Sequence, residues 1–208
     1  RCRIDPRTLL PAMMFNNCGN MGLPLALLAF GQQGFQAFVV LFIVSNLLHF
    51  TLGAFIFSHH TSLAGLRRNP IVIATLLGLV FGLSGITLPA WLMAGIRMLG
   101  EMTIPLMLFA LGVRMVDVSF AGWRVGLLGA VLCPLTGLAG AALAIPLLQL
   151  APEQTALVVL FGALPPAVLN FLMAELYQQE PERMASIVLI GNLASLLFVP
   201  LGLAFALR

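Results

Sequence analysis

Residues 8–31 read TLLPAMMFNNCGNMGLPLALLAFG, an apolar stretch of membrane-spanning length that amides and helix breakers interrupt in its middle. The interruption contains three asparagines, two glycines and a proline: Asn16, Asn17, Gly19, Asn20, Gly22 and Pro24. Because proline lacks a backbone donor and glycine adds conformational freedom, we expect the helix to open near Pro24. Irregular backbone is tolerated in hydrocarbon only where protein or a wet cavity surrounds it. The stretch therefore predicts a polar site that other helices shield.

A second interrupted stretch lies near the other end of the chain. Residues 154–177 read QTALVVLFGALPPAVLNFLMAELY, in which Pro165 and Pro166 break an apolar segment and Asn170 follows. Two broken membrane segments in corresponding positions are typical of the binding site of a secondary transporter. We therefore expect the two breaks to meet within the membrane.

The composition is that of a protein embedded in a lipid bilayer. Of 208 residues, 61% are hydrophobic and 8% are charged, whereas a soluble domain has about 25% charged residues. We therefore predict an all-α polytopic integral membrane protein. All ten basic residues are arginines, and most lie in short connections, which membrane topology explains better than a nucleic-acid partner does.

The sequence has no pattern for enzymatic or metal chemistry. The motifs HExxH and GxxxxGK[ST] are both missing. Cys2, Cys18 and Cys133 stand in unrelated contexts without metal-ligand spacing. We therefore expect neither an enzyme nor a bound metal, and no cofactor other than a coupling ion, H⁺ or Na⁺.

Seven apolar segments are long enough to cross the hydrocarbon, which takes about 20 residues each. They occupy residues 8–31, 35–57, 70–89, 90–115, 123–150, 154–177 and 184–207. With the start of the chain in the cytoplasm, eight of the ten arginines fall on the cytoplasmic side, and the outward loops have none. This distribution satisfies the positive-inside rule.

The order of broken and continuous segments indicates an inverted repeat. Residues 8–31 and 35–57 form a broken segment followed by a continuous one, and so do residues 154–177 and 184–207, which enter from the opposite side. We therefore interpret residues 1–58 as the last two helices of a first repeat and residues 69–208 as a complete second five-helix repeat. This arithmetic predicts a ten-helix (5+5) transporter fold with three further spans before Arg1.

Three runs resemble the auxin efflux carrier family of membrane transporters, which includes bacterial permeases and plant exporters. They are NNCGNMGLPL at 16–25, PLMLFALG at 105–112 and LPPAVLNFLMAELY at 164–177. The resemblance implies two inverted five-span repeats whose broken helices cross at the substrate site. It also implies a homodimer, formed through a static scaffold to which residues 70–115 belong.

The resemblance further assigns roles residue by residue. Six positions match the two breaks of the family: Asn17, Gly22 and Pro24 in the first, and Pro165, Ala174 and Tyr177 in the second. At two positions the chain departs from the proline pattern of the family: Asn16, where plant members have proline, and Asn170, at the second crossover proline. These departures argue against auxin as the substrate.

The polar residues of the breaks suit an organic anion. The ends of broken helices expose backbone N–H groups and a positive dipole, and asparagine amides donate hydrogen bonds without carrying charge. We hypothesise that Asn16, Asn17, Asn20 and Asn170 surround a carboxylate. The alternative is that these amides only satisfy the opened backbone.

Two titratable residues are candidates for ion coupling. Arg97 and Glu101 stand four residues apart, a spacing that suits an ion pair on one helix face, and Glu101 could instead carry protons. His49 is the only histidine within a span, and an unperturbed histidine titrates near neutral pH. The alternative for His49 is a packing role.

We interpret the chain as a secondary active transporter that moves a small organic anion across the bacterial cytoplasmic (inner) membrane by alternating access. A sodium-coupled symporter of the bile-acid type is the main alternative, and it predicts acidic or hydroxyl-rich sodium ligands at the crossing. A membrane scaffold or sensor that transports nothing is the third interpretation. We expect the segments outside residues 70–115 to form the mobile substrate-binding bundle.

Overall fold

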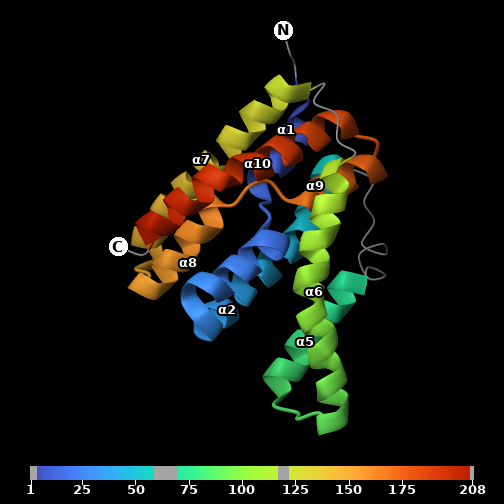
Figure 1. The fold of residues 1–208 in the computed structure, drawn as a ribbon, viewed down its shortest axis with the longest axis vertical. Coiled ribbons are helices and arrows are strands. Elements are labelled where there is room, and N and C mark those ends of the chain that lie inside the picture. The colour runs from blue at the N-terminus through green and yellow to red at the C-terminus, as the bar shows by residue number, and fades with distance from the viewer. Residues whose placement is uncertain (1–3, 59–69, 117–121, 207–208) are drawn as a thin grey trace.

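The computed structural model describes residues 4–58, 70–116 and 122–206, and most of them are helical (Figure 1). In chain order the elements are α1 (Pro6–Met14), η1 (Cys18–Gly22), α2 (Leu23–Leu48), η2 (His49–Gly53), α3 (Ala54–Phe57), α5 (Pro70–Ser84), α6 (Ala90–Val116), α7 (Trp123–Leu148), α8 (Pro152–Ala163), α9 (Val168–Leu176) and α10 (Pro181–Ala206). Within these residues the only β pairing is a single bridge between Asn16 and Pro166. The all-α class is therefore confirmed. Of the eight arginines that the topology argument assigns to the cytoplasmic side, Arg1, Arg3, Arg67 and Arg68 lie outside the described residues.

Three helices of the described residues are long and apolar enough to cross a bilayer: Cys18–Phe57, Trp123–Leu148 and Pro181–Ala206. The first joins two predicted spans at a kink at Gly31, where φ is +67° and glycine is the residue that adopts the conformation without strain. The predicted segment 70–89 contains the 15-residue α5, and the segment 154–177 is divided between α8 and α9. The apolar helices support a multi-pass protein, while the count of seven spans stays a prediction.

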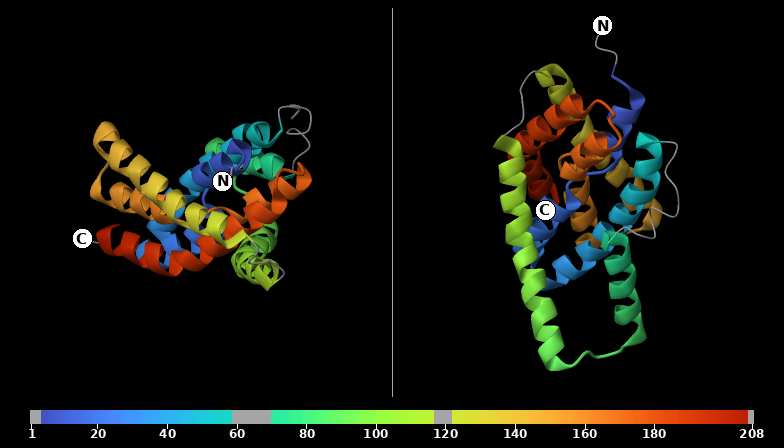
Figure 2. Two further views of the ribbon diagram at one scale, coloured as in Figure 1. Left: turned by 90° about the horizontal axis from the view of Figure 1, so that it is seen from above. Right: turned by 90° about the vertical axis from the view of Figure 1, so that its right-hand side faces the viewer.

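The best-packed part of the molecule is a layer of α7, α8 and α10 (Figures 1 and 2). α7 approaches α10 closely, because a Cβ on Gly129 would lie 2.5 Å from Cγ2 of Ile187. α7 also meets α8 backbone to backbone, since a Cβ on Gly137 would lie 2.2 Å from the carbonyl oxygen of Gly162. Small residues at these positions let the helices come together as they do in membrane bundles.

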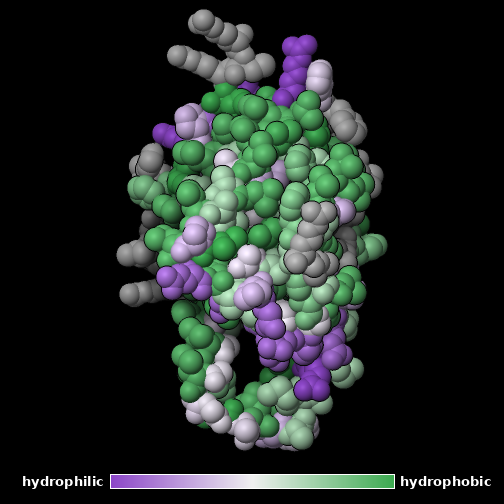
Figure 3. All heavy atoms as spheres, turned by 90° about the vertical axis from the view of Figure 1, so that its left-hand side faces the viewer, coloured by the Kyte–Doolittle hydropathy of each residue, from purple (hydrophilic) through white to green (hydrophobic). Residues whose placement is uncertain are grey.

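α5 and α6 form a hairpin that projects from this layer (Figures 1 and 2). The principal contact of the hairpin with the rest of the molecule is between α6 and η1. Large apolar side chains of the hairpin are exposed, among them Leu76, Val80, Leu83, Trp91 and Leu99. Hydrophobic residues also cover most of the face in Figure 3. Such surfaces are expected where a helix faces lipid tails, which are as apolar as leucine.

Candidate functional site

The first interruption separates α1 from η1. α1 ends at Met14, Phe15 is extended with φ −117° and ψ 107°, and helical structure resumes at Cys18. The expected opening near Pro24 is therefore wrong, because Pro24 lies in the first turn of α2. The reason is that η1 is a π turn, in which the N–H of Leu23 bonds to the carbonyl of Cys18. This wide turn runs directly into α2. Pro24 then lies in the first turn of α2, where its missing N–H breaks no helical hydrogen bond.

Gly19, Asn20 and Gly22 lie within η1, beside the second interruption. A Cβ on Gly22 would lie 2.7 Å from the ring of Phe38 and 2.8 Å from Cδ1 of Leu164. The absence of a side chain at Gly22 therefore lets η1 approach the second interruption. The helix does not open at Gly22.

The second interruption is residues 164–167, between α8 and α9. Leu164 and Ala167 are extended, with ψ of 148° and 137°. Pro165 and Pro166 stand between them, and neither has an N–H group that could continue α8. The residue before a proline also avoids the helical region, which places the helix end before Leu164.

The two interruptions cross and pair through their backbones around the bridge described above. The N–H of Asn17 donates to the carbonyl of Pro165 at 2.7 Å, and the N–H of Ala167 donates to the carbonyl of Phe15 at 3.0 Å. The pairing is antiparallel, so Phe15, Asn16 and Asn17 lie opposite Ala167, Pro166 and Pro165 respectively. The pairing gives the opened backbone groups partners that a lipid environment does not offer.

Asparagine side chains reinforce this pairing. Asn16 Nδ2 donates to the carbonyl of Phe161 at 2.5 Å, and Asn170 Nδ2 donates to the carbonyl of Phe15 at 3.0 Å. Asn17 Nδ2 also donates within the protein. The amide donors of these asparagines are therefore used by the crossing itself, which favours a structural role for them.

Asn192 of α10 is a site residue that the sequence hypothesis did not include. Its Oδ1 accepts from Asn17 Nδ2 at 2.9 Å, and its Nδ2 donates to the carbonyls of Pro166 at 3.2 Å and Val188 at 2.8 Å. Asn192 therefore joins both interruptions to α10. The available signal is one buried asparagine in an otherwise apolar span.

Among the residues that the structure describes, three buried polar atoms at the crossing have no hydrogen-bond partner: Asn16 Oδ1, Asn170 Oδ1 and His49 Nε2. The ring of His49 stacks on Phe15, with centroids 4.2 Å apart and 5° between the planes. The Asn170 side chain is the polar neighbour of the imidazole. An unpaired buried polar atom is costly, and the two amide oxygens accept hydrogen bonds only, so an N–H or O–H group would satisfy them and a carboxylate would not.

Asn20 differs from the other asparagines of the hypothesis. It is half-buried, and its side chain makes no hydrogen bond within the described residues. It lies in the first turn of the helix that starts at Cys18, and α9 also starts at the crossing. Both helix N-termini bring partial positive charge to this place.

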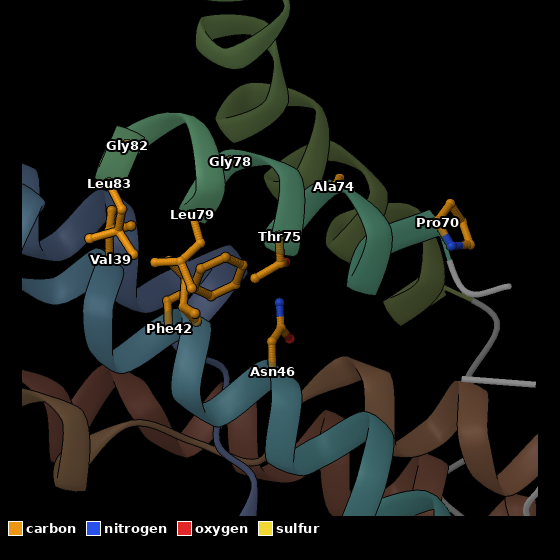
Figure 4. Close-up of a pocket in the computed structure, with 11 residues that line it drawn as sticks. Val39, Phe42, Asn46, Pro70, Ala74, Thr75, Gly78, Leu79, Gly82 and Leu83 are labelled. Carbon is orange, nitrogen blue, oxygen red and sulfur yellow. The ribbon is translucent and has the colours of Figure 1, made fainter. Parts of the chain in front are cut away.

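Two cavities lie near these elements. The cavity at the crossing has a volume of about 320 Å³ and is lined by Asn16, by Met13 of α1, by Phe161 of α8 and by the face of α7 between residues 133 and 144. A larger cavity of about 810 Å³ lies between α2 and α5, where Asn46 points toward Thr75 (Figure 4). None of the sequence-predicted site residues lines the larger cavity. The smaller one is therefore the candidate solute site.

A comparison with family models places the chain among known proteins. A model described as a membrane transport protein matches residues 59–203, more than half of the chain, and the matched part includes the second interruption. The chain belongs to the auxin efflux carrier family of membrane transport proteins. The resemblance seen in the sequence is thereby confirmed, and the protein is a multi-pass membrane transport protein. A comparison with curated proteins finds no match.

Two positions of this auxin efflux carrier family member match the family pattern but lie outside the crossing, Ala174 and Tyr177, and both contribute to packing. Ala174 is fully buried in α9. Tyr177 stacks on Phe57, with ring centroids 6.2 Å apart. Within the described residues no group of three His, Cys, Asp or Glu side chains is placed to hold a metal ion.

Glu101 and Arg97 of the family member do not take part in the crossing. Both side chains are exposed on α6, and the ion pair expected between them does not form. Among the described residues an ion pair joins Arg183 and Glu180 instead. The spacing of Arg97 and Glu101 permits a pair but does not enforce it, because an exposed pair gains little free energy.

Proposed function

We propose that this protein is a secondary active transporter that moves a small organic anion, such as a carboxylate, across the bacterial cytoplasmic membrane by alternating access. The observation that supports the proposal most is the crossing. Two interrupted helices pair through their backbones beside a cavity, in a chain of a transporter family. Interrupted helices near the middle of the membrane form the solute sites of many secondary transporters.

The charge pattern at the crossing favours an anion. Two helices begin there, and each N-terminus carries about half of a positive elementary charge. No acidic side chain is among the described residues that line the 320 Å³ cavity. We infer that the carboxylate lies at the N-termini near Asn20, and that the apolar part of the solute occupies the cavity beside Met13 and Phe161. Asn16, Asn17 and Asn170 hold the crossing in place.

The architecture proposed is a pair of inverted five-helix repeats. The correspondence of residues 15–17 with residues 165–167 is what an inverted repeat requires at its centre. The crossing helices with α7 and α10 would form the mobile bundle. The projecting hairpin of α5 and α6 would belong to a static scaffold and to the interface of a homodimer, which fits its exposed apolar surface.

The energy source proposed is a gradient of H⁺ or Na⁺. Of the two candidates for ion coupling, His49 contacts the crossing through Phe15, whereas Glu101 is exposed on the hairpin. The two candidates therefore make different predictions, because a coupling ion must be bound differently in the two states of the transport cycle.

Uptake of radiolabelled benzoate into proteoliposomes tests the proposal. The protein at its full natural length, given an imposed proton or sodium gradient, should accumulate benzoate above protein-free vesicles, and unlabelled monocarboxylates should compete. Asn20→Leu should lower uptake at least about tenfold, because it removes a hydrogen bond to a charged group. Gln33→Leu, at an exposed position of the kink in α2, is the matched control.

The outcomes of this assay separate the interpretations. Accumulation that is driven by a proton gradient in the absence of sodium would exclude the sodium-coupled symporter of the bile-acid type. An absence of uptake for benzoate and for a panel of aliphatic and aromatic carboxylates would refute the organic-anion transporter. Full uptake by Asn20→Leu would show that Asn20 does not bind the carboxylate.

A further inference from the structure

The turn between α9 and α10 reaches back to the start of α1 through one carboxylate. Glu180 Oε2 accepts a hydrogen bond from Thr8 Oγ1 at 2.7 Å and another from the N–H of Asp5 at 3.3 Å. Glu180 Oε1 pairs with Arg183 in the first turn of α10. The Glu180 side chain thus bonds to residues that precede it by 172 and 175 positions in the chain.

The surroundings of Glu180 fix this carboxylate in place. Thr8 is fully buried, and Gln179 Nε2 donates to its hydroxyl at 3.5 Å. The backbone of Glu180 has φ +41°, a conformation that residues other than glycine rarely adopt. Its carbonyl also accepts from the N–H groups of Arg183 and Met184, which caps the start of α10. Glu180 therefore bonds both to the start of α1 and to the first turn of α10.

The connection makes α1 and α9 a pair that is tied at both ends. At the crossing, the backbone of Ala167 and the amide of Asn170 both bond to the carbonyl of Phe15. Near the opposite ends of the two helices, Glu180, in the turn that joins α9 to α10, bonds to Asp5 and Thr8 at the start of α1. The other two half-helices at the crossing lack such a tie, since no hydrogen bond of the described residues joins the kink at residue 31 to the start of α8.

We propose that Glu180 is a positioning residue that clamps α1 to α9, so that these two half-helices move as one unit and keep the crossing in register. The inference rests on the proposed transport function, because it assigns to the clamp the task of holding the solute site together while the bundle moves. Solute must then enter and leave beside the pair formed by α1 and α9, and not between them.

Hydrogen–deuterium exchange of the full-length protein in lipid nanodiscs tests the clamp without a solute. In Glu180→Ala, the amides of Asn17 and Ala167 at the crossing should exchange at least about tenfold faster, since local opening of a segment follows the loss of its ties. Glu180→Gln keeps an oxygen acceptor for Thr8 and should recover most of the protection. Glu182→Ala, an exposed neighbour in the first turn of α10, should leave exchange at the crossing unchanged.

Two results would overturn the clamp. One is faster exchange that is confined to residues 5–8, which would make the contact a local helix cap. The other is an equal increase in every helix, which would make Glu180 a residue of general stability.

A covalent replacement of the clamp gives a second readout. In Asp5→Cys/Glu180→Cys with Cys2 replaced, a short thiol cross-linker should restore slow exchange at the crossing and should permit benzoate uptake. Cys18 and Cys133 are buried and stay unlabelled. A cross-link that slows exchange but blocks uptake would show that α1 and α9 separate during transport, which contradicts the clamp. If the wild type moves no carboxylate, the proposed function fails while the exchange experiment still decides the clamp.

Discussion

The two interruptions at the crossing make the same backbone pairing by different chemistry. The second contains Pro165 and Pro166, whose rings fix φ and remove N–H groups that would otherwise need partners. The first contains Asn16 and Asn17, whose side chains donate to α8 and α10. One interruption is therefore held mainly by covalent geometry and the other mainly by side-chain hydrogen bonds. Substitutions should therefore affect the two in different ways.

The largest loss of stability is expected where a rigid part is overpacked. A Cβ at Gly191 would lie 2.6 Å from Cδ of Pro166, so Gly191→Ala should lower the free energy of unfolding by about 3 kcal/mol. Gly22→Ala presses on the ends of two buried side chains, Phe38 and Leu164, which yield more readily than a proline ring, and should cost less, about 2 kcal/mol. Denaturation in detergent measures both, with Gly140→Ala as control because a Cβ there meets nothing within 4 Å. Equal losses at residues 22 and 191 would show that the second interruption is no stiffer.

A smaller loss is expected from breaking the hydrogen bonds of the first interruption. Asn17→Ala leaves Asn192 Oδ1 buried without its donor, which should cost about 2 kcal/mol. Benzoate uptake should be lost while the protein stays folded. In a double-mutant cycle, Asn17→Ala with Asn192→Ala should cost less than the sum of the single losses. Additive losses would mean that the two amides do not depend on each other.

A still smaller loss is expected from Asn16→Pro. The N–H and carbonyl of Asn16 take no part in the pairing, which runs through its neighbours, so only the bond from Nδ2 to Phe161 is lost. The cost should be about 1 kcal/mol in the same denaturation experiment. Asn17→Pro removes the N–H that bonds to Pro165 and should be far more disruptive. If the two variants were equally unstable, the pairing pattern would be wrong.

The smallest effects are expected from the candidates for ion coupling. Glu101→Gln should change neither stability nor the pH profile of uptake, because Glu101 is exposed away from the crossing. His49→Phe keeps a ring that can stack on Phe15 and should change stability by less than about 1 kcal/mol. Uptake measured across a pH series checks both variants. Loss of the pH dependence in either one would assign proton coupling to that residue.

The sequence predicts the places of the helix ends better than their details. α1 ends just before Asn16, and α8 ends just before the Pro165–Pro166 pair, both within the stretches that sequence reasoning singled out. The predicted opening at Pro24 is wrong because a π turn, which has no sequence signature of its own, precedes α2 and places Pro24 in the first helical turn, where no N–H is needed. Asn192 was missed because a tertiary hydrogen bond across 175 positions leaves no local pattern.

The number of membrane spans and the role of the asparagines depend on information that the chain does not encode locally. The interrupted segment 154–177 yields α8 and α9, which are each too short to be recognised as a span by length. Whether an asparagine binds solute or backbone depends on which carbonyl lies nearby, and that is set by packing. The structure uses Asn16, Asn17 and Asn170 for the backbone and leaves Asn20 without a hydrogen bond among the described residues.

Asparagine and proline face each other at the centre of the bridge, at positions 16 and 166. The backbone hydrogen bonds of the crossing are made by the residues on either side of positions 16 and 166. The residue type at these two positions can therefore change during evolution while the architecture persists. A proline at position 16, as in plant members of the family, is compatible with the same backbone pairing. The side chains at the centre of the crossing can therefore vary at a small cost to the backbone pairing.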